Sequence, residues 1–256
     1  MNLTIVKVGG KVVENLDSLN SLLSQFSKIA GHKMLVHGGG RSATELAERL
    51  GIESKMIDGR RITDEETLKV VTMVYGGLVN KNIVAGLQSL GLDAIGLTGA
   101  DMNIMLSVKR PVKDDGIDYG FVGDVKSVNS SVLVKLMGND FVPVLAPLTH
   151  DGKGHILNTN ADTIAGEAAK ALTFDYNVRL VYCFEKKGVL MDEADDNSVI
   201  KFLNRDLYEE YKTKGIITKG MIPKLENAFQ AIAAGVKEVI ITSAENLNDG
   251  EGTTIR

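Results

Sequence analysis

Short apolar runs that end in glycine alternate with helical patterns in the first part of the chain. Residues 3–8 form an apolar run that ends at Gly9-Gly10, and residues 33–36 form another that leads into the glycines at 38–40. After each run, apolar residues recur at helical spacing, over residues 16–29 and 43–50. This repeated strand–loop–helix order predicts an α/β fold with a mostly parallel sheet covered by helices.

The same alternation continues to the end of the chain. Asp58-Gly59 between extended residues is typical of a tight hairpin turn, and Thr63 with Glu66 fits a capping box that opens a long helix. Gly235 is placed to end the helix of residues 224–235. Further strands are expected at residues 94–97, 142–145, 178–184 and 238–242, a helix at 163–172, and a second hairpin within 112–125.

The domain organisation is expected to be one compact unit of two lobes. No internal repeat, low-complexity tract or flexible linker interrupts the pattern. The length of 256 residues suits one large α/β domain or two packed lobes. We place the N-lobe at about residues 1–174 and the C-lobe at about 175–256.

Composition excludes several classes of protein. The net charge is -4 and no block of basic residues stands out, which disfavours nucleic acid as a partner. Cys183 is the single cysteine, so no disulfide can form within the chain and a reducing compartment is indicated. The N-terminal residues lack the pattern of a signal peptide, and no run approaches 18 apolar residues. We therefore expect a cytoplasmic protein without a membrane span.

Two glycine clusters, each directly after a predicted strand, are candidates for anion binding. Lys7 precedes Gly9 and Gly10, while Gly39 and Gly40 belong to the second cluster. Ligands of open α/β sheets bind beyond the carboxyl ends of the strands, and glycines there expose backbone N–H groups. Either cluster alone could equally be a tight turn without a ligand. Neither fits a P-loop or G-x-G-x-x-G, so a Walker-type ATPase and a nicotinamide enzyme are poor interpretations.

Other candidate residues each have an ordinary structural explanation. Lys219 and Lys224 flank a Gly-Met turn and could be solvated, and Asp162 could simply cap a helix. His37 beside its glycines is more often structural than catalytic, and the four histidines show no spacing typical of metal ligands. Cys183 in an apolar strand is expected to be a buried, inert thiol.

Five segments taken together resemble the amino acid kinase family, and most of all its members that phosphorylate an N-acylated glutamate. The segments are IVKVGGK, VHGGGRSATE, DGRRIT, NTNADTIAGEAA and GIITKGMIPK. The resemblance covers nearly the whole chain. It implies a three-layer αβα sandwich around a mostly parallel open sheet. The implied activity is the ATP-dependent phosphorylation of the γ-carboxylate of N-acetyl-L-glutamate, the second step of arginine biosynthesis.

The resemblance also implies roles for individual residues. Lys7 and Lys224 would stabilise the transferring phosphoryl group from opposite sides, and Asp162 would hold both lysines. Mg²⁺ would be held mainly through the phosphates of ATP, without a protein metal site. Gly9 and Gly10 would donate to phosphate oxygens, with further nucleotide contacts from Glu185, Lys186, Lys187, Gly188, Val189, Leu190, Ile216, Ile217 and Thr218. The acylated amino acid would be bound by Gly39, Gly40, Arg61 and Asn158.

The chain departs from the family pattern in two places. A small polar residue and Asp usually precede the nucleotide-loop glycine, where this chain has Phe184 and Glu185. Arginine-inhibited members carry a helix before the first strand, which here begins almost at Met1, so we expect an arginine-insensitive homodimer. N-succinylglutamate, another carboxylate or carbamate substrate, and a non-catalytic amino-acid sensor are the alternatives. Retention of Lys7, Asp162 and Lys224 argues against the sensor.

Overall fold

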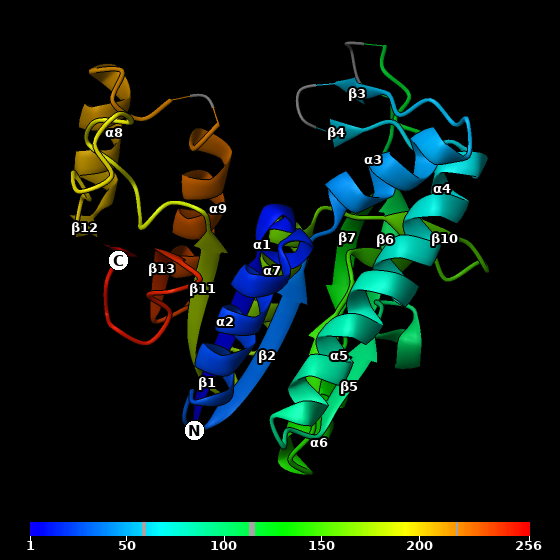
Figure 1. Ribbon diagram of the computed structural model, residues 1–256, viewed down its shortest axis with the longest axis horizontal. Helices are drawn as coiled ribbons and strands as arrows, with labels where there is room; N and C mark the ends of the chain where they lie inside the picture. The colour runs from blue at the N-terminus through cyan, green and yellow to red at the C-terminus, as the bar shows by residue number, and fades with distance from the viewer. Residues whose placement is uncertain (58–59, 113–115, 219) are drawn as a thin grey trace.

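An eight-stranded, mostly parallel sheet forms the centre of the protein (Figure 1). The computed structural model describes residues 1–57, 60–112, 116–218 and 220–256. Its strand order is β12 (Phe202–Leu203), β14 (Thr253–Ile255), β13 (Glu238–Ser243), β11 (Asn177–Phe184), β1 (Asn2–Val8), β2 (His32–His37), β8 (Val142–Leu145) and β5 (Ala94–Leu97). Only the β13–β14 pair is antiparallel within the described part of this sheet, which confirms the predicted architecture.

Helices cover the sheet on both sides because its strand residues alternate between two cores. In β1, Leu3 and Ile5 belong to one buried cluster, whereas Val6 and Val8 belong to the other. The first cluster includes residues of α6 (Ser130–Gly138), α7 (Ala161–Ala171), α8 (Arg205–Thr213) and α9 (Ile222–Ala233). The second includes residues of α1 (Gly10–Glu14), α2 (Leu16–Ser27), α3 (Gly40–Arg49), α4 (Glu65–Val71), the π-helical segment η1 (Thr72–Val79) and α5 (Asn80–Ser89).

Two smaller sheets lie beside the long helix formed by α4, η1 and α5, on the right of Figure 1. One has the order β10 (Ile156–Asn158), β9 (Leu148–His150), β6 (Met105–Lys109) and β7 (Gly123–Val128), and a 3₁₀ turn, η2 (Asp101–Asn103), precedes β6. The other is the antiparallel pair β3 (Met56–Ile57) and β4 (Arg60–Arg61), which agrees with the predicted hairpin. Its turn residues, Asp58 and Gly59, lie outside the described residues.

The predicted end of one helix is confirmed, whereas the predicted start of another is wrong. Gly235 follows α9 with φ of +98°, as its predicted C′ position requires. The capping box at Thr63 is wrong: Asp64 is the N-cap of α4, and its carboxylate accepts from the Thr67 N–H at 2.8 Å. Thr63 instead pairs through its backbone with Tyr119 and Phe121, so it is engaged in a strand-like contact before the helix begins. The second hairpin also differs, because β7 pairs with β6, upstream of the predicted segment.

The long helix over Glu65–Ser89 was not singled out as a membrane candidate, yet its length and composition would allow a span. Many of its apolar residues instead lie in the protein interior. Val70, Val71, Val74, Ile83 and Leu87 are each at most 1% exposed and belong to the second core cluster. Packing against the sheet therefore accounts for the apolar character of this helix.

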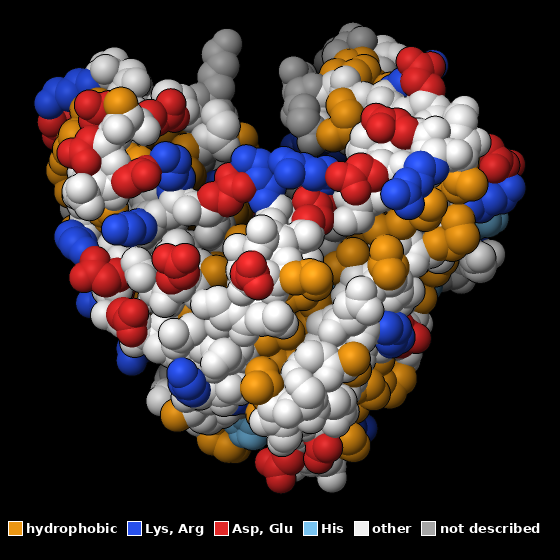
Figure 2. Space-filling model, in the orientation of Figure 1, with side chains coloured by type: hydrophobic (Ala, Val, Ile, Leu, Met, Phe, Trp, Pro, Cys, Tyr) orange, Lys and Arg blue, Asp and Glu red, His pale blue; other side chains and the backbone are white. Residues whose placement is uncertain are grey.

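The sheet brings the predicted site residues to one edge. The strands β1, β2, β11 and β13 run parallel, so their carboxyl ends meet at the same edge of the sheet. In Figure 1 this edge lies between the two parts of the molecule that point upwards. Figure 2 shows a notch at this place, with Lys and Arg side chains gathered at its base. Ligands of open α/β sheets bind at such an edge.

Candidate active site

Lys7 and Asp162 form a largely buried ion pair at the centre of this edge. Lys7 is the penultimate residue of β1, and its Nζ lies 2.7 Å from Oδ1 of Asp162 in the first turn of α7. The two side chains are 8% and 14% exposed. The alternative that Asp162 caps its helix is wrong, because the side chain of Asn160 accepts from the N–H groups of Asp162 and Thr163. The Asp162 carboxylate is therefore free to pair with Lys7.

Lys224 lies close enough to this ion pair to respond to both of its charges. It lies in the first turn of α9, after Pro223, and is half-buried. Burial lowers the pKa of Lys224; the Asp162 charge opposes this shift and the Lys7 charge adds to it. Its Nζ lies 3.8 Å from the centroid of the Phe184 ring, and Nζ of Lys7 lies 5.0 Å from the same centroid. Lys224 is therefore a site cation and not a solvated surface lysine.

A cavity of about 370 Å³ opens beside these lysines. Seven residues that the sequence assigned to phosphate or nucleotide contacts line it: Lys7, Gly9, Gly10, Glu185, Lys186, Gly188 and Lys224. Lys11, Val12, Phe184, Met221 and Ile241 line it as well. Apolar strand ends such as Ile241 gave no functional signal in the sequence, since the same pattern marks any buried strand.

The remaining residues of the predicted nucleotide set lie around the cavity without lining it. Val189 and Leu190 are 3% and 8% exposed, and the Val189 N–H donates to Oγ1 of Thr253 at 2.8 Å. Lys187 is exposed. Ile217 is buried, Ile216 is partly exposed, and the hydroxyl of Thr218 donates to Glu193 at 3.2 Å.

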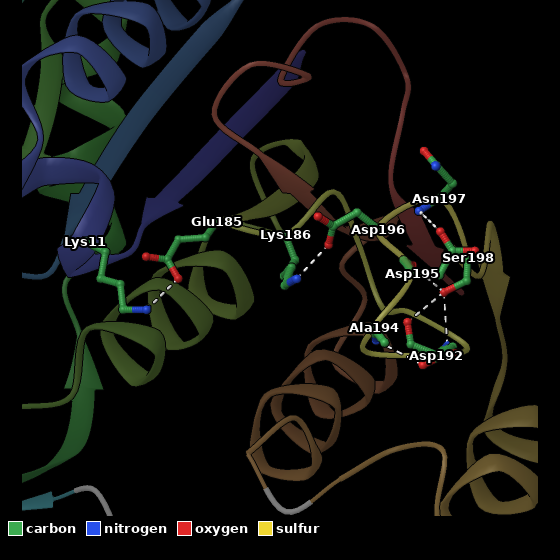
Figure 3. Close-up of polar contacts among 9 residues, drawn as sticks. All are labelled: Lys11, Glu185, Lys186, Asp192, Ala194, Asp195, Asp196, Asn197 and Ser198. Carbon is green, nitrogen blue, oxygen red and sulfur yellow. Dashed lines mark hydrogen bonds and ion pairs between the residues drawn. The ribbon is translucent and has the colours of Figure 1, made fainter.

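Two ion pairs involve Lys11, Glu185 and Lys186 of the cavity lining (Figure 3). Nζ of Lys11, on α1, lies 2.7 Å from a carboxylate oxygen of Glu185, which follows β11. Nζ of Lys186 lies 2.6 Å from Asp196 in the loop that begins after Leu190. All four side chains are more than half exposed, so these contacts are too solvated to add much to stability. They place two cations and one carboxylate in the lining of the cavity, with Asp196 paired from outside it.

The two glycine clusters lie against each other. A Cβ atom at Gly38 would be 3.2 Å from the backbone nitrogen of Gly10, and a Cβ at Gly10 would be 3.6 and 3.7 Å from the nitrogens of Gly39 and Gly40. Gly9 and Gly10 border the cavity, while Gly39 and Gly40 begin α3. The sites that these clusters could form for two anions are therefore adjacent, which neither cluster could indicate alone.

Tyr75 closes the second glycine cluster from the side and was missed by the sequence analysis. Gly39 has φ of +153°, and a Cβ there would meet the Tyr75 ring at 3.1 Å and Val79 at 3.3 Å. Tyr75 belongs to the π-helical segment η1, a geometry frequent at functional sites. Burial raises the pKa of the Tyr75 hydroxyl, while the Arg61 charge opposes that shift. The pair Gly76-Gly77 inside an otherwise helical pattern was the available signal.

Arg61 and Asn158 are connected through Thr63. The Arg61 guanidinium donates to the Gly40 carbonyl at 2.8 Å, and it also donates to the hydroxyls of Thr44 at 2.8 Å and Ser54 at 2.7 Å. Nδ2 of Asn158 donates to the Thr63 hydroxyl, which donates to the Arg61 carbonyl. These bonds fix the β3–β4 hairpin over the start of α3. The structure thus brings Gly39, Gly40 and Arg61 together, and Asn158 is connected to Arg61 through Thr63.

His37 and Cys183 are buried next to the site, in agreement with their structural interpretation. Both are fully buried, and burial lowers the pKa of His37 to about 4 and raises the pKa of the Cys183 thiol to about 12. The His37 ring contacts Nδ2 of Asn80 at 3.2 Å and the Gly38 carbonyl at 2.7 Å. A neutral imidazole and a protonated thiol at neutral pH cannot supply charge to the cavity.

The fold and this edge define a class of protein: an α/β phosphotransferase. Two buried or half-buried ammonium groups flank one carboxylate beside a cavity, and two glycine turns meet at its border. Cations and backbone donors arranged in this way can hold two anions together and stabilise a phosphoryl group passing between them.

Comparison with known proteins agrees with this class. The model of the amino acid kinase family matches residues 2–243, so the chain belongs to the amino acid kinase family, whose kinases use ATP. An acetylglutamate kinase of Phocaeicola vulgatus is 67% identical over 254 residues, covering 99% of this chain and 98% of that one. The acetylglutamate kinase of Bacteroides thetaiotaomicron is 66% identical with the same coverage. The solved structure of smu.665 from Streptococcus mutans UA159 superposes with a TM-score of 0.81 at 30% identity, covering 99% and 98% of the two chains.

Proposed function

We propose that this protein is an acetylglutamate kinase of arginine biosynthesis. A γ-carboxylate oxygen of N-acetyl-L-glutamate attacks the γ-phosphorus of ATP. The bond between that phosphorus and the bridging β,γ-oxygen breaks, and ADP leaves with the bridging oxygen. The products are N-acetylglutamyl 5-phosphate and ADP. Full-length relatives at 66–67% identity bear this name, which makes it the best-supported activity.

The observation that carries the proposal is the cluster of Lys7, Asp162 and Lys224 at the cavity. The γ-carboxylate has an ordinary pKa of about 4.3, so it is already ionised at neutral pH and needs no general base. The difficulty is to bring this anion against the triphosphate. Two ammonium groups with one carboxylate near them leave a net positive charge there, which stabilises the negative charge of the transition state.

The proposal assigns a role to each group around the cavity. Lys7 and Lys224 contact the transferring phosphoryl group, and Asp162 holds Lys7 in place. Gly9 and Gly10 donate backbone hydrogen bonds to the phosphates. The side chains and backbone of residues 185–190 and 216–218 bind the nucleotide. Mg²⁺ travels with ATP and is held mainly by phosphate oxygens, as this ion commonly is.

N-acetylglutamate lies on the other side of the meeting glycines. Gly39 and Gly40 bind the end of the substrate that carries the γ-carboxylate, since their backbone nitrogens face Gly10. Arg61 pairs with the α-carboxylate, because a planar guanidinium matches a carboxylate in two-point contact and three of its five donors suffice for its present bonds. Asn158 bonds nearby. The N-lobe, about residues 1–174, binds this substrate, and the C-lobe, about residues 175–256, binds ATP.

A cytoplasmic homodimer is the assembly that we propose. β5 is an edge strand of the large sheet, and edge strands in native proteins are usually covered or paired. Met73 and Leu78 are 52% and 57% exposed on the long helix of the same half of the molecule. Apolar side chains beside an open strand edge suit a two-fold contact with a second copy. Sedimentation equilibrium tests this assembly.

The activity is tested by measuring ADP release with ATP and Mg²⁺ while hydroxylamine traps any acyl phosphate. N-acetylglutamate, N-succinylglutamate, glutamate and aspartate are compared at equal concentration. Hydroxamate formed best from N-acetylglutamate supports the proposal. Preference for N-succinylglutamate would mean that the substrate carries a succinyl group instead of an acetyl group. Turnover of only glutamate or aspartate would overturn the assignment. Lys224→Ala should abolish most of the signal, whereas Lys237→Ala, an exposed lysine after α9, should leave it unchanged.

A further inference from the structure

The aromatic ring of Phe184 lies close to both cations of the site. Its centroid is 3.8 Å from Nζ of Lys224 and 5.0 Å from Nζ of Lys7, both within the range of cation–π attraction. Phe184 is the last residue of β11 and lines the cavity.

The ring is held in position by its neighbours. It is stacked parallel to the fully buried ring of Tyr182, with centroids 6.1 Å apart and planes 4° apart. Gly9 provides the space on another side, since a Cβ there would lie 3.5 Å from Cδ1 of Phe184. A ring packed in this way presents a fixed surface to the ammonium groups rather than following them.

Lys224 depends on this ring more than Lys7 does. Lys7 has the Asp162 carboxylate at 2.7 Å. Within the described residues no carboxylate lies at ion-pair distance from Lys224, although the charges of Asp162 and Glu185 favour its protonated form. Burial and the Lys7 charge act in the opposite direction. The face of the ring, with its centroid 3.8 Å from Nζ, therefore supports the Lys224 ammonium.

An aromatic ring suits this position because it carries no net charge. A carboxylate in its place would hold two lysines firmly, but it would repel the phosphates and compete with them for both cations. The quadrupole of a phenyl ring attracts ammonium groups and leaves the cavity positive. An arriving phosphate can draw Lys224 from the ring without replacing a carboxylate at ion-pair distance.

We propose that Phe184 is a positioning residue that holds the ammonium groups of Lys7 and Lys224 towards the cavity and favours the protonated form of Lys224. This inference rests on the proposed function for the use that the reaction makes of Lys224. The contact itself can be measured without catalysis.

The decisive experiment reduces the negative charge on the face of the ring while keeping the ring nearly the same size. Phenylalanine at position 184 is exchanged for its mono-, di- and trifluorinated analogues, which weaken cation–π attraction stepwise, and for leucine in Phe184→Leu. The Lys224 Cε resonance, assigned with Lys224→Arg, is followed by NMR from pH 7 to 11. Phe202→Leu is the matched control, since Phe202 is 46% exposed on β12 of the same half of the molecule.

We expect the pKa of Lys224 to fall with each added fluorine, by about one unit for the trifluorinated ring and for Phe184→Leu. Binding of the non-hydrolysable ATP analogue AMP-PNP should weaken about 3- to 10-fold above neutral pH, in the same order, because a neutral Lys224 loses its attraction to phosphate. Phe202→Leu should change neither value. An unaltered Lys224 pKa across the fluorinated series would overturn the proposal.

A separate arm distinguishes this inference from the proposed activity. If the wild-type protein fails to form hydroxamate from N-acetylglutamate while the fluorinated series shifts the Lys224 pKa, the activity is wrong and the role of the ring stands. If the kinase is active and fluorination moves neither the pKa nor the alkaline limb of kcat/KM, Phe184 is only a packing residue. In the latter case Phe184→Leu lowers stability alone.

Discussion

Replacement of the carboxylate in Asp162→Asn tests the charge arrangement of the site most directly. The amide keeps the shape of the side chain and an oxygen that accepts from Lys7, so the change removes chiefly one negative charge. It leaves Lys7 without its ion-pair partner. Lys224 loses the larger of the two carboxylate charges that oppose the effect of burial on its pKa, and the charge of Glu185 remains.

The size of the effect follows from the geometry of the pair. At 2.7 Å, the gross attraction between unit charges is about 6 kcal/mol for an effective dielectric constant of about 20. Breaking a buried ion pair by removing one partner typically costs about 3–5 kcal/mol. Asp162 is 14% exposed and the amide oxygen remains, so we take a lower value, about 3 kcal/mol. Applied to the transition state, this corresponds to a loss in kcat of about 10²-fold.

The assay is a pH series of coupled ADP release with N-acetylglutamate as acceptor. Activity requires protonated Lys224, so it falls as pH rises through the pKa of that group. Because the variant lacks the Asp162 charge, its alkaline limb should lie at lower pH than that of the wild type. Urea unfolding of both proteins separates a loss of folding from a loss of rate. A variant of normal stability with unchanged kcat and an unmoved alkaline limb would refute the reasoning.

Three further changes test other parts of the site. Lys224→Ala should lower kcat by about 10²-fold or more with little change in KM for N-acetylglutamate, in steady-state kinetics; a change in KM alone would mean that Lys224 serves ground-state binding. Arg61→Lys should raise KM for N-acetylglutamate about tenfold with little change in kcat, since the lysine cannot form the two-point contact, and an unaltered KM would remove Arg61 from substrate binding. His37 is buried with its pKa lowered to about 4 from 6.5, so its contribution to stability is complete above pH 6.5 and is lost as pH falls towards 4. The free energy of unfolding should fall by about 3 kcal/mol over that interval, and His37→Gln should flatten this dependence in urea titrations; equal slopes would show that another group titrates.

The sequence predicted the succession of elements well where local rules apply. The apolar run at residues 94–97 predicted both ends of β5. Gly235 predicted the end of α9, because glycine adopts the positive φ found there. The start of α4 was misplaced by one residue, because Thr63 and Asp64 are both good capping residues and only the backbone pairing of Thr63 decides between them. Pattern alone does not include such distant pairing.

The residues of the candidate site also divide into those that the sequence could indicate and those that depend on distant contacts. Lys7, Asp162 and Lys224 were found through motif resemblance, and they do come together. Tyr75 escaped notice, because a tyrosine in an apolar helix is indistinguishable from core until the π-helical segment turns it towards Gly39. Phe184 was noticed only as a departure from a pattern, without a place relative to the lysines.

The amino-acid sequence was enough to predict the chemistry of this protein: glycine turns after buried strands, cations without a general base, and the order of strands and helices along the chain. Those features depend on residue type and on neighbours along the chain. Tertiary structure decided which of them act together. The parallel register of β1, β2 and β11 brings two glycine turns into contact, and packing of α7 and α9 on the same face brings Asp162 and Lys224 to Lys7. Charges and rings interact through distances in space, and those distances exist only after the sheet has formed.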